Sequence, residues 1–254
     1  MTGSTRTLKI ATFTLFALVL LCALIALGTW QLRRLEWKEQ LIADVNARIE
    51  AAPVPAMGPD QWADLSQEES EYLPVTATGT YNHDREVHVW FPLNNPRGGD
   101  YGGSGYFILT PLTTAEGWTV IVNRGFVPET MKQTETRPQT LVAGEQTVTG
   151  LVRFDEPEHW NSPRPDREKN VWIGRQVDKM AGFMLLDQDR TAPYWIDLLS
   201  GQGVNGLPQG GETRITFRNA HLSYALTWFG LAFALIAVYG AWIYRSLRGP
   251  SARS

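Results

Sequence analysis

Two long apolar runs lie near the two ends of the chain, and strand-like segments fill the region between them. Residues 10–28 (IATFTLFALVLLCALIALG) and 224–243 (YALTWFGLAFALIAVYGAWI) contain no charged side chain. Each run is about 20 residues long, or roughly 30 Å as a helix, which matches the hydrocarbon thickness of a bilayer. The pattern therefore predicts two transmembrane helices, with both chain ends on one side of the membrane.

A cleavable signal peptide is the alternative for the first run. Arg6 and Lys9 precede it, and residues 26–28 (ALG) resemble a cleavage site. Signal peptides carry an apolar stretch of only about 7 to 15 residues, however, so we interpret this longer run as an uncleaved anchor. Basic residues flank the spans equally on both sides, and the orientation is therefore inferred from the anchor-like N-terminus, which favours cytoplasmic tails.

The expected organisation follows from these spans. It consists of a cytoplasmic tail at 1–9, a first span at 10–28, a periplasmic domain at 29–219, a second span at 220–244 and a cytoplasmic tail at 245–254. The domain begins with an amphipathic stem, because apolar residues keep a helical period to about Glu50 before the stretch AAPVP ends it.

The period of the apolar positions changes to two after Tyr72, which is typical of β-strands. The segments are rich in Val, Ile, Thr and aromatic residues, and we expect antiparallel strands at 75–81, 86–91, 105–112, 117–127, 146–154 and 194–198. A short helix is expected at 173–183. The predicted fold class is a membrane protein with two transmembrane α-helices flanking a β-rich α+β extramembrane domain, either a partly closed barrel or a sheet with helices at one end.

Composition narrows the function classes. The 254 residues carry a formal net charge of -3, and the domain has no basic stripe, so nucleic acid is not an expected partner. The single cysteine, Cys22, lies inside the first apolar run, which excludes a disulfide within the domain.

Candidate catalytic and metal-binding residues are few. His83 and His88 are five apart on predicted strands, so their side chains point to opposite faces and are interpreted as surface histidines. Ser104 lacks the glycine that a nucleophile elbow needs at position 106, and its glycine-rich stretch 95–105 is expected to be a mobile hairpin loop. Proximity in sequence does not make a triad of His159, Ser162 and Asp166. The sequence thus predicts no enzyme.

Two clusters of aromatic, basic and histidine side chains lie at the membrane boundaries. Each cluster shares one helix face by its spacing: Trp30, Arg33, Arg34 and Trp37 on the first helix, and His221, Tyr224 and Trp228 on the second. Antiparallel spans would place the clusters at one depth, so we expect them to face each other. They could form an ordinary interfacial belt. They could equally hold a porphyrin, through an imidazole on iron, flat aromatic contacts and arginines on propionates.

Several motifs occur together in a characteristic order. They are LGTWQLRRLEWKEQLI (27–42), VTATGTY (75–81), GYFILTPL (105–112), VIVNRGFVP (120–128) and NAHLSYALTWFGLAF (219–233). From about Leu27 to Tyr239 the chain resembles the Surfeit locus protein family, the Shy-type assembly factors of cytochrome c oxidase. It departs from the pattern at Phe126, where many relatives have tryptophan, and in the glycine-rich stretch.

The resemblance implies a multi-pass protein of the bacterial cell inner membrane, or of the mitochondrial inner membrane in eukaryotes, with its main domain on the outer side. It implies a role in maturing the haem a-containing subunit I of the oxidase, with subunit I, haem a synthase and membrane lipid as partners. By position in the motif, His221 would bind the haem iron. The alternative is a membrane chaperone that stabilises subunit I without binding haem. The oligomeric state stays open.

Overall fold

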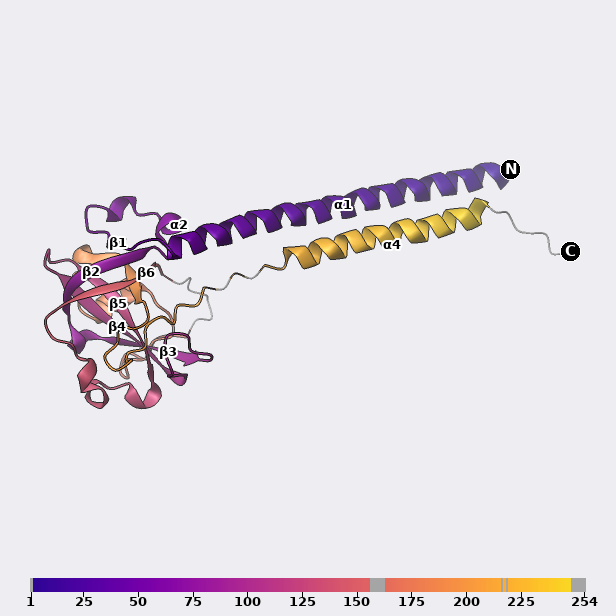
Figure 1. Cartoon of the computed structure of the whole chain (residues 1–254). Coiled ribbons are helices and arrows are strands. Elements are labelled where there is room, and N and C mark those ends of the chain that lie inside the picture. Colours follow the sequence, from indigo (N-terminus) through magenta and orange to yellow (C-terminus); the bar gives the residue numbers. More distant parts are fainter. Residues whose placement is uncertain (1, 156–162, 216, 218, 248–254) are drawn as a thin grey trace. The chain divides into compact units, whose positions relative to one another are not determined.

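A computed structural model of the chain describes residues 2–155, 163–215, 217 and 219–247. These residues form two compact units, one comprising residues 1–44 and 216–254 and the other residues 45–215. The first unit contains most of α1 (Thr2–Ile49) and all of α4 (His221–Leu247), and the second contains the seven strands (Figure 1).

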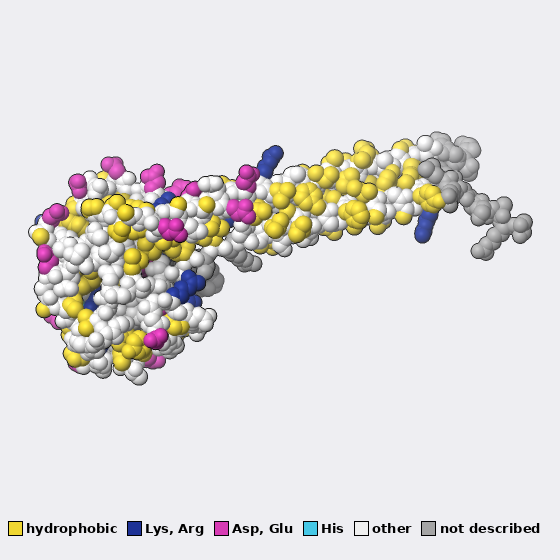
Figure 2. All heavy atoms as spheres, in the orientation of Figure 1, with side chains coloured by type: hydrophobic (Ala, Val, Ile, Leu, Met, Phe, Trp, Pro, Cys, Tyr) yellow, Lys and Arg dark blue, Asp and Glu magenta, His cyan; other side chains and the backbone are white. Residues whose placement is uncertain are grey.

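Both long helices have the length and composition needed to cross a membrane. α1 continues without a break for 48 residues, so the membrane helix extends past the apolar run into the stem. Hydrophobic side chains cover most of the visible face of the helix pair, as the lipid-facing surface of a spanning helix requires (Figure 2). The predicted two-span membrane class is confirmed.

The two helices pack along a seam whose buried and half-buried positions alternate by three and four residues. On α1 the seam includes Thr14, Ala17, Leu21, Leu24, Gly28, Gln31 and Leu35, and on α4 it includes His221, Ala225, Trp228, Ala232, Leu235, Tyr239 and Trp242. An average spacing of 3.5 residues is the repeat by which two helices keep one seam in contact. The contacts Gln31 with His221 and Thr14 with Tyr239 show that the helices run antiparallel.

The second unit is a closed β-barrel. Five strands form the ring in the order β2 (Pro74–Tyr81), β6 (Glu145–Arg153), β7 (Thr191–Leu198), β5 (Thr119–Pro128) and β4 (Gly103–Thr114). The pairing of β4 with β2 closes it. Two further strands extend the sheet at its ends: β1 (Val54–Pro55) beside β2 and β3 (Val87–Leu93) beside β4. Of the two predicted arrangements, the barrel is confirmed, and it is fully closed.

The expectation that the predicted strands all run antiparallel is wrong at one pair, and a second parallel pair involves β1, a strand that was not predicted. β7 is parallel to β5, and β1 is parallel to β2. Parallel neighbours need a long crossover in place of a tight turn, and the chain between β5 and β7 includes all of β6 and α3 (Val177–Phe183). Residue patterns within each strand contain no information on such a distant partner. The described helices also include the short α2 (Gln67–Ser70), and α3 begins four residues later than expected, at Val177.

Side chains of the ring strands alternate between two cores. Val120 and Val122 of β5 point into the barrel interior, whose core takes side chains from all five ring strands. Ile121 points outward into a second core, where Trp195 of β7 and Met180 of α3 pack against β3 and β4. This alternation follows from the two-residue period of a strand. It explains why β5 reads as a nearly continuous apolar run.

Candidate functional site

His221 begins α4 and contacts α1 through its imidazole ring. The ring atom Nδ1 lies 2.7 Å from Oε1 of Gln31, and Gln31 is only 8% exposed. With a carbonyl oxygen as its partner, Nδ1 is the donor, and in the tautomer with a single N–H the other nitrogen, Nε2, keeps its lone pair. No described residue forms a hydrogen bond with Nε2. The arrangement thus presents one ring nitrogen with an available lone pair at the end of the helix pair.

This pairing fits a metal-binding histidine. Histidines that bind a metal through one nitrogen usually donate the other N–H to a carbonyl or carboxylate, which fixes the ring and raises its basicity. Gln31 was not among the residues predicted from the sequence, because the neighbouring tryptophans and arginines dominate the local pattern. A signal was present: Gln31 follows Ala17 and Leu24 at intervals of seven, as a polar residue in an otherwise apolar seam.

The predicted cluster on α1 does not face the cluster on α4, so that part of the expectation is wrong. Trp30 is 56% exposed and Trp37 49% exposed, and both arginines, Arg33 and Arg34, are exposed as well. Among the described residues, the face of α1 that contains Gln31 is the one that contacts α4. The seam repeats every 3.5 residues, so it excludes the tryptophans and arginines that lie between its positions.

Helical geometry nevertheless brings most of the predicted residues to one flank of the pair. A rotation of 100° per residue turns Trp30, Arg34 and Trp37 by about 60° to 120° from Gln31, all in one direction. Because the helices are antiparallel, Tyr224 leaves the seam toward the same side, where it is 54% exposed. Two other placements complete the predicted set: Trp228 is half-buried in the seam, and Arg33 lies about 160° from Gln31 on the far side of α1.

Aromatic and basic side chains stack on one another at this flank. The Arg34 guanidinium lies 3.9 Å from the ring centroid of Trp37. The ammonium of Lys38 lies 5.3 Å from the ring of Phe217 and 6.0 Å from that of Trp37. Such cation–π pairs hold positive charge beside flat apolar surface. This combination suits a flat ligand with anionic substituents.

Two more contacts align the helices along the seam. The hydroxyls of Thr14 and Tyr239 lie 2.5 Å apart, which gives each a hydrogen-bond partner within an apolar surrounding. Gly28 lies against the ring of Phe229, where a Cβ atom would come within 2.7 Å of ring carbons. Close approach at Gly28 therefore supports the contact of Gln31 with His221, one turn further along α1.

The VNRGF segment of β5 forms a bulge in the barrel. In the ladder with β4, Asn123 pairs with Leu109 and Gly125 pairs with Ile108, so Arg124 has no partner of its own. The side-chain oxygen of Asn123 accepts from Gly125 N at 3.2 Å, which holds the bulge. Gly125 adopts a φ of 123°, a conformation that favours glycine. A bulge turns the extra side chain away from the strand's regular alternation.

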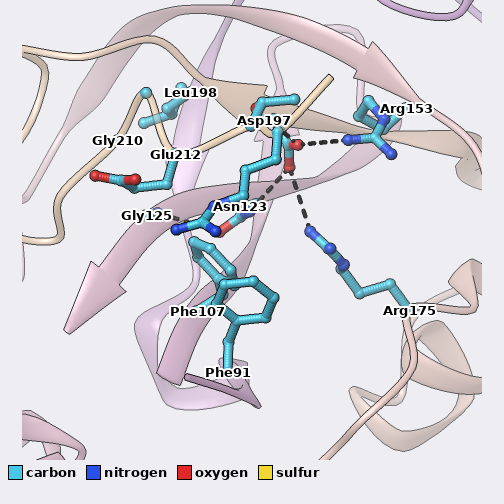
Figure 3. Close-up of a pocket in the computed structure, with 13 residues that line it drawn as sticks. Phe91, Phe107, Asn123, Gly125, Arg153, Arg175, Asp197, Leu198, Gly210 and Glu212 are labelled. Atoms are coloured by element: carbon cyan, nitrogen blue, oxygen red, sulfur yellow. Dashed lines mark hydrogen bonds and ion pairs between the residues drawn. The ribbon is translucent and has the colours of Figure 1, made fainter. Parts of the chain in front are cut away.

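A cavity of about 200 Å³ opens beside this bulge (Figure 3). Its centre is Asp197, which is 2% exposed. Asp197 accepts hydrogen bonds from the side chains of Asn123 (2.8 Å), Arg153 (3.2 Å), Trp195 (3.0 Å) and Thr213 (2.9 Å) and lies 4.0 Å from Arg175. Donors surround both oxygens of this carboxylate. We therefore interpret the cluster as structural, because it attaches residue 213 to the barrel.

A second carboxylate in the cavity wall, Glu212, is matched in the same way. It accepts from the backbone N–H groups of Arg97 and Gly98 and from the side chain of Gln209. Gln209 in turn binds Tyr101 through both its amide atoms. The glycine-rich stretch is therefore tied down by hydrogen bonds, contrary to the expected mobile loop.

The remaining sequence candidates also need correction. His88 is not a surface residue: it is 5% exposed and lies 2.8 Å from Glu86. His83 is half-buried and lies 3.0 Å from the carbonyl oxygen of Val142. Two members of the considered triad, at positions 159 and 162, lie outside the described residues. Within the described part of the chain, no group of three or more His, Cys, Asp or Glu could hold a metal ion.

Together these features define a two-span membrane protein that carries a closed β-barrel between its spans and an oriented histidine at the start of its second long helix. Comparison with known proteins agrees: the SURF1 family model matches residues 18–233. The chain is 34% identical over 230 residues to Surfeit locus protein 1 of Rattus norvegicus, which covers 86% of this chain and 72% of the relative. It is 34% identical over 233 residues to Surfeit locus protein 1 of Homo sapiens, covering 88% and 74%. It is 36% identical over 238 residues to a SURF1-like protein of Drosophila melanogaster, covering 89% and 76%.

The chain therefore belongs to the SURF1 family, an assembly-factor family. Membership implies a role in cytochrome c oxidase assembly. The family resemblance stated from the motifs is confirmed.

Proposed function

We propose that this protein binds haem a as a cargo and assists its delivery to subunit I of cytochrome c oxidase, with His221 as the ligand of the haem iron. The observation that carries the proposal is the hydrogen bond between Gln31 Oε1 and His221 Nδ1, at 2.7 Å. It orients the imidazole and leaves Nε2 for iron. A histidine that merely capped a helix end would not need a buried partner on another helix.

The flank beside His221 supplies the other contacts that a haem requires. Trp30, Trp37 and Tyr224 offer flat apolar surface, and Trp228 adds part of its ring from the seam. Arg34 is the arginine placed to pair with propionates, since it lies on this flank, and Arg33 would contribute only from the far side of α1. A cargo must be released, so contacts at an exposed flank suit transfer better than a closed pocket.

We place the protein in the bacterial inner membrane, with the barrel in the periplasm and both tails in the cytoplasm. Subunit I and haem a synthase are the partners that this role requires. The support is the presence of two spans and the anchor-like N-terminus. A reporter enzyme that works only in the cytoplasm should be active when it is fused to the C-terminus. If only a reporter that works in the periplasm were active there, the proposed orientation would be wrong.

A chaperone that steadies subunit I without touching haem is the second candidate. The exposed tryptophans of α1 favour it, because an apolar flank can dock against a partner helix as well as against a porphyrin. In that case His221 would serve only to join α1 to α4.

The visible spectrum of the purified protein distinguishes the two. The full chain is produced in cells that synthesise haem a and purified in an uncharged detergent. The parent protein should carry haem, and His221→Ala should lose it or change its spectrum strongly, because the iron–imidazole bond is lost. Tyr224→Phe should only weaken binding, and His83→Ala, a histidine change in the barrel, should leave the spectrum unchanged. An unaltered spectrum and haem content in His221→Ala would favour the chaperone.

A further inference from the structure

The barrel contains more buried positive charge than buried negative charge near the bulge of β5. Arg124 is 5% exposed and Arg137 is fully buried. The one carboxylate beside them, Glu86, is bound by Arg137 and by His88 through the same oxygen, Oε1. Within the described part of the chain, no carboxylate lies within ion-pair distance of Arg124.

Neutral groups are the only partners that Arg124 has among the described residues. Its guanidinium donates to the carbonyl oxygen of Thr140 at 2.5 Å and to Nδ1 of His83 at 3.3 Å, and it lies 4.9 Å from the ring centroid of Tyr81. His83 accepts at Nδ1 and donates from Nε2 to Val142 O, so it is the neutral tautomer. Glu86 attracts Arg124 without forming an ion pair with it, and a buried charge without an ion-pair partner is costly.

Arg124 lines a cavity of about 260 Å³ that is distinct from the one around Asp197. The cavity lies where the loop 202–208 passes over β6 and β7, and its apolar wall consists of Val142, Val148, Leu198, Val204 and Pro208. Two glutamines in the wall, Gln146 and Gln202, already bind backbone groups. The lining thus combines one buried cation with an apolar wall and several neutral polar side chains.

Tyr81 adds a hydrogen-bond donor to this cavity. The residue is 8% exposed, and its buried hydroxyl proton has no acceptor among the described residues. Burial raises the pKa of Tyr81 to about 12, so the hydroxyl remains protonated at neutral pH. A guanidinium and a phenol O–H can both donate charge-assisted hydrogen bonds to a carboxylate.

The Asp197 cavity, in the same barrel, is a site in which the cations face a carboxylate. There Arg153 and Arg175 approach a carboxylate that the chain itself supplies (Figure 3). At Arg124 the described residues supply the cation and a donor but no carboxylate within ion-pair distance, and the bulge of β5 turns this one side chain out of the regular ladder.

We propose that the cavity lined by Arg124 and Tyr81 binds a small organic carboxylate, whose anionic group lies between the guanidinium and the phenol and whose apolar body lies against the valine and proline wall. The site is separate from the haem contacts proposed above and does not depend on them.

Benzoate is the probe, because it joins a carboxylate to a small apolar ring. It is titrated by calorimetry into the full chain in an uncharged detergent, and the expected result is saturable binding. Benzyl alcohol, which has the same ring without the charge, should not bind. Arg124→Gln should abolish binding, and Tyr81→Phe should weaken it about tenfold, the value of one hydrogen bond to a charged group. Tyr194→Phe is the matched control: Tyr194 lies in the same core, but its hydroxyl donates to Met57 O at 2.7 Å, so the affinity should not change.

Four outcomes would overturn the proposal. These are no saturable binding of benzoate to the parent protein, equal binding of benzyl alcohol, tighter binding of inorganic phosphate than of benzoate, and an unchanged affinity in Tyr81→Phe. If Arg124→Gln does not fold, the comparison of Tyr81→Phe with Tyr194→Phe decides alone.

Discussion

The helix pair and the barrel use buried polar groups in opposite ways. Along the helix seam the polar contacts between α1 and α4 include Gln31 with His221 and Thr14 with Tyr239. In the barrel, polar groups form dense networks, such as the one in which Asp197 receives donors from several strands and from residue 213. The polar groups that lack a matching partner among the described residues differ accordingly. On the helices this group is a ring nitrogen, Nε2 of His221, and in the barrel it is a buried cation, Arg124.

The difference follows from the surroundings of each unit. A helix satisfies its own backbone, so a polar side chain in the seam is free to serve a ligand. A small barrel must hold loops across its ends, and Asp197 and Glu212 do this with their full set of acceptors. Changes in the barrel networks should therefore cost stability, whereas changes at the seam should cost binding.

Asp197→Ala is the change with the largest expected effect. It removes the buried carboxylate to which Asn123 and Trp195 donate and one of the two carboxylates beside Arg153, and breaking a buried pair costs about 3–5 kcal/mol. Unfolding of the barrel, followed by tryptophan fluorescence in denaturant, measures this cost. Asp166→Ala is the control, because Asp166 forms a solvent-exposed pair with Lys169, and such pairs contribute little to stability. Equal losses of unfolding free energy in both variants would show that the Asp197 network does not stabilise the barrel.

Gln31→Leu should leave the fold intact and weaken haem binding. The leucine keeps the size of the side chain and suits the seam, but it removes the acceptor for His221 Nδ1. Loss of an outer-shell partner usually costs about 10- to 100-fold in metal affinity. Haem content at fixed expression measures the effect, with Gln40→Leu on the exposed side of the stem as control. If Gln31→Leu carried as much haem as the parent, the hydrogen bond would have no part in binding.

Gly28→Ala tests the close approach of the helices. The new methyl group would meet the ring of Phe229, which can shift, so the expected cost is about 1 kcal/mol, the low end for overpacking. The distance between spin labels at Leu18 and Val238, both exposed, should increase slightly in a Cys22→Ser background. Gly230→Ala, where a Cβ atom meets nothing within 4 Å, should leave it unchanged. An increase in both variants would point to helix distortion in place of a clash.

Acidification should weaken the barrel slightly through His83. Burial lowers the pKa of His83, so the folded protein holds its imidazole neutral while the unfolded chain takes up a proton near the ordinary pKa of about 6.5. The free energy of unfolding should therefore fall as the pH drops from 7 toward 5. The free energy of unfolding of the His83→Gln variant should fall less over this pH range. A carboxylate whose pKa is lowered, such as Glu86, loses its contribution to stability only at more acidic pH. The pH range therefore distinguishes the effect of His83 from that of Glu86. Identical pH profiles of parent and His83→Gln would exclude His83 as the cause.

The sequence by itself determined the elements whose cause is local. Uncharged runs of bilayer length identified both spans, and alternating β-branched and aromatic residues identified the strands that form the barrel. The order of motifs identified the family. His221 was found in the same way, since its place in the motif depends on neighbours along one helix.

Only the tertiary structure decided the contacts that join distant segments. Closure of the ring by β4 with β2 and the parallel pair of β5 and β7 depend on partners far away in the chain, which no local pattern encodes. The choice of Gln31, and not Arg33 or Arg34, as the neighbour of His221 depends on which face of α1 meets α4. The charge imbalance at Arg124 emerged in the same way, because counting charges in a sequence does not tell which arginine lacks a buried carboxylate.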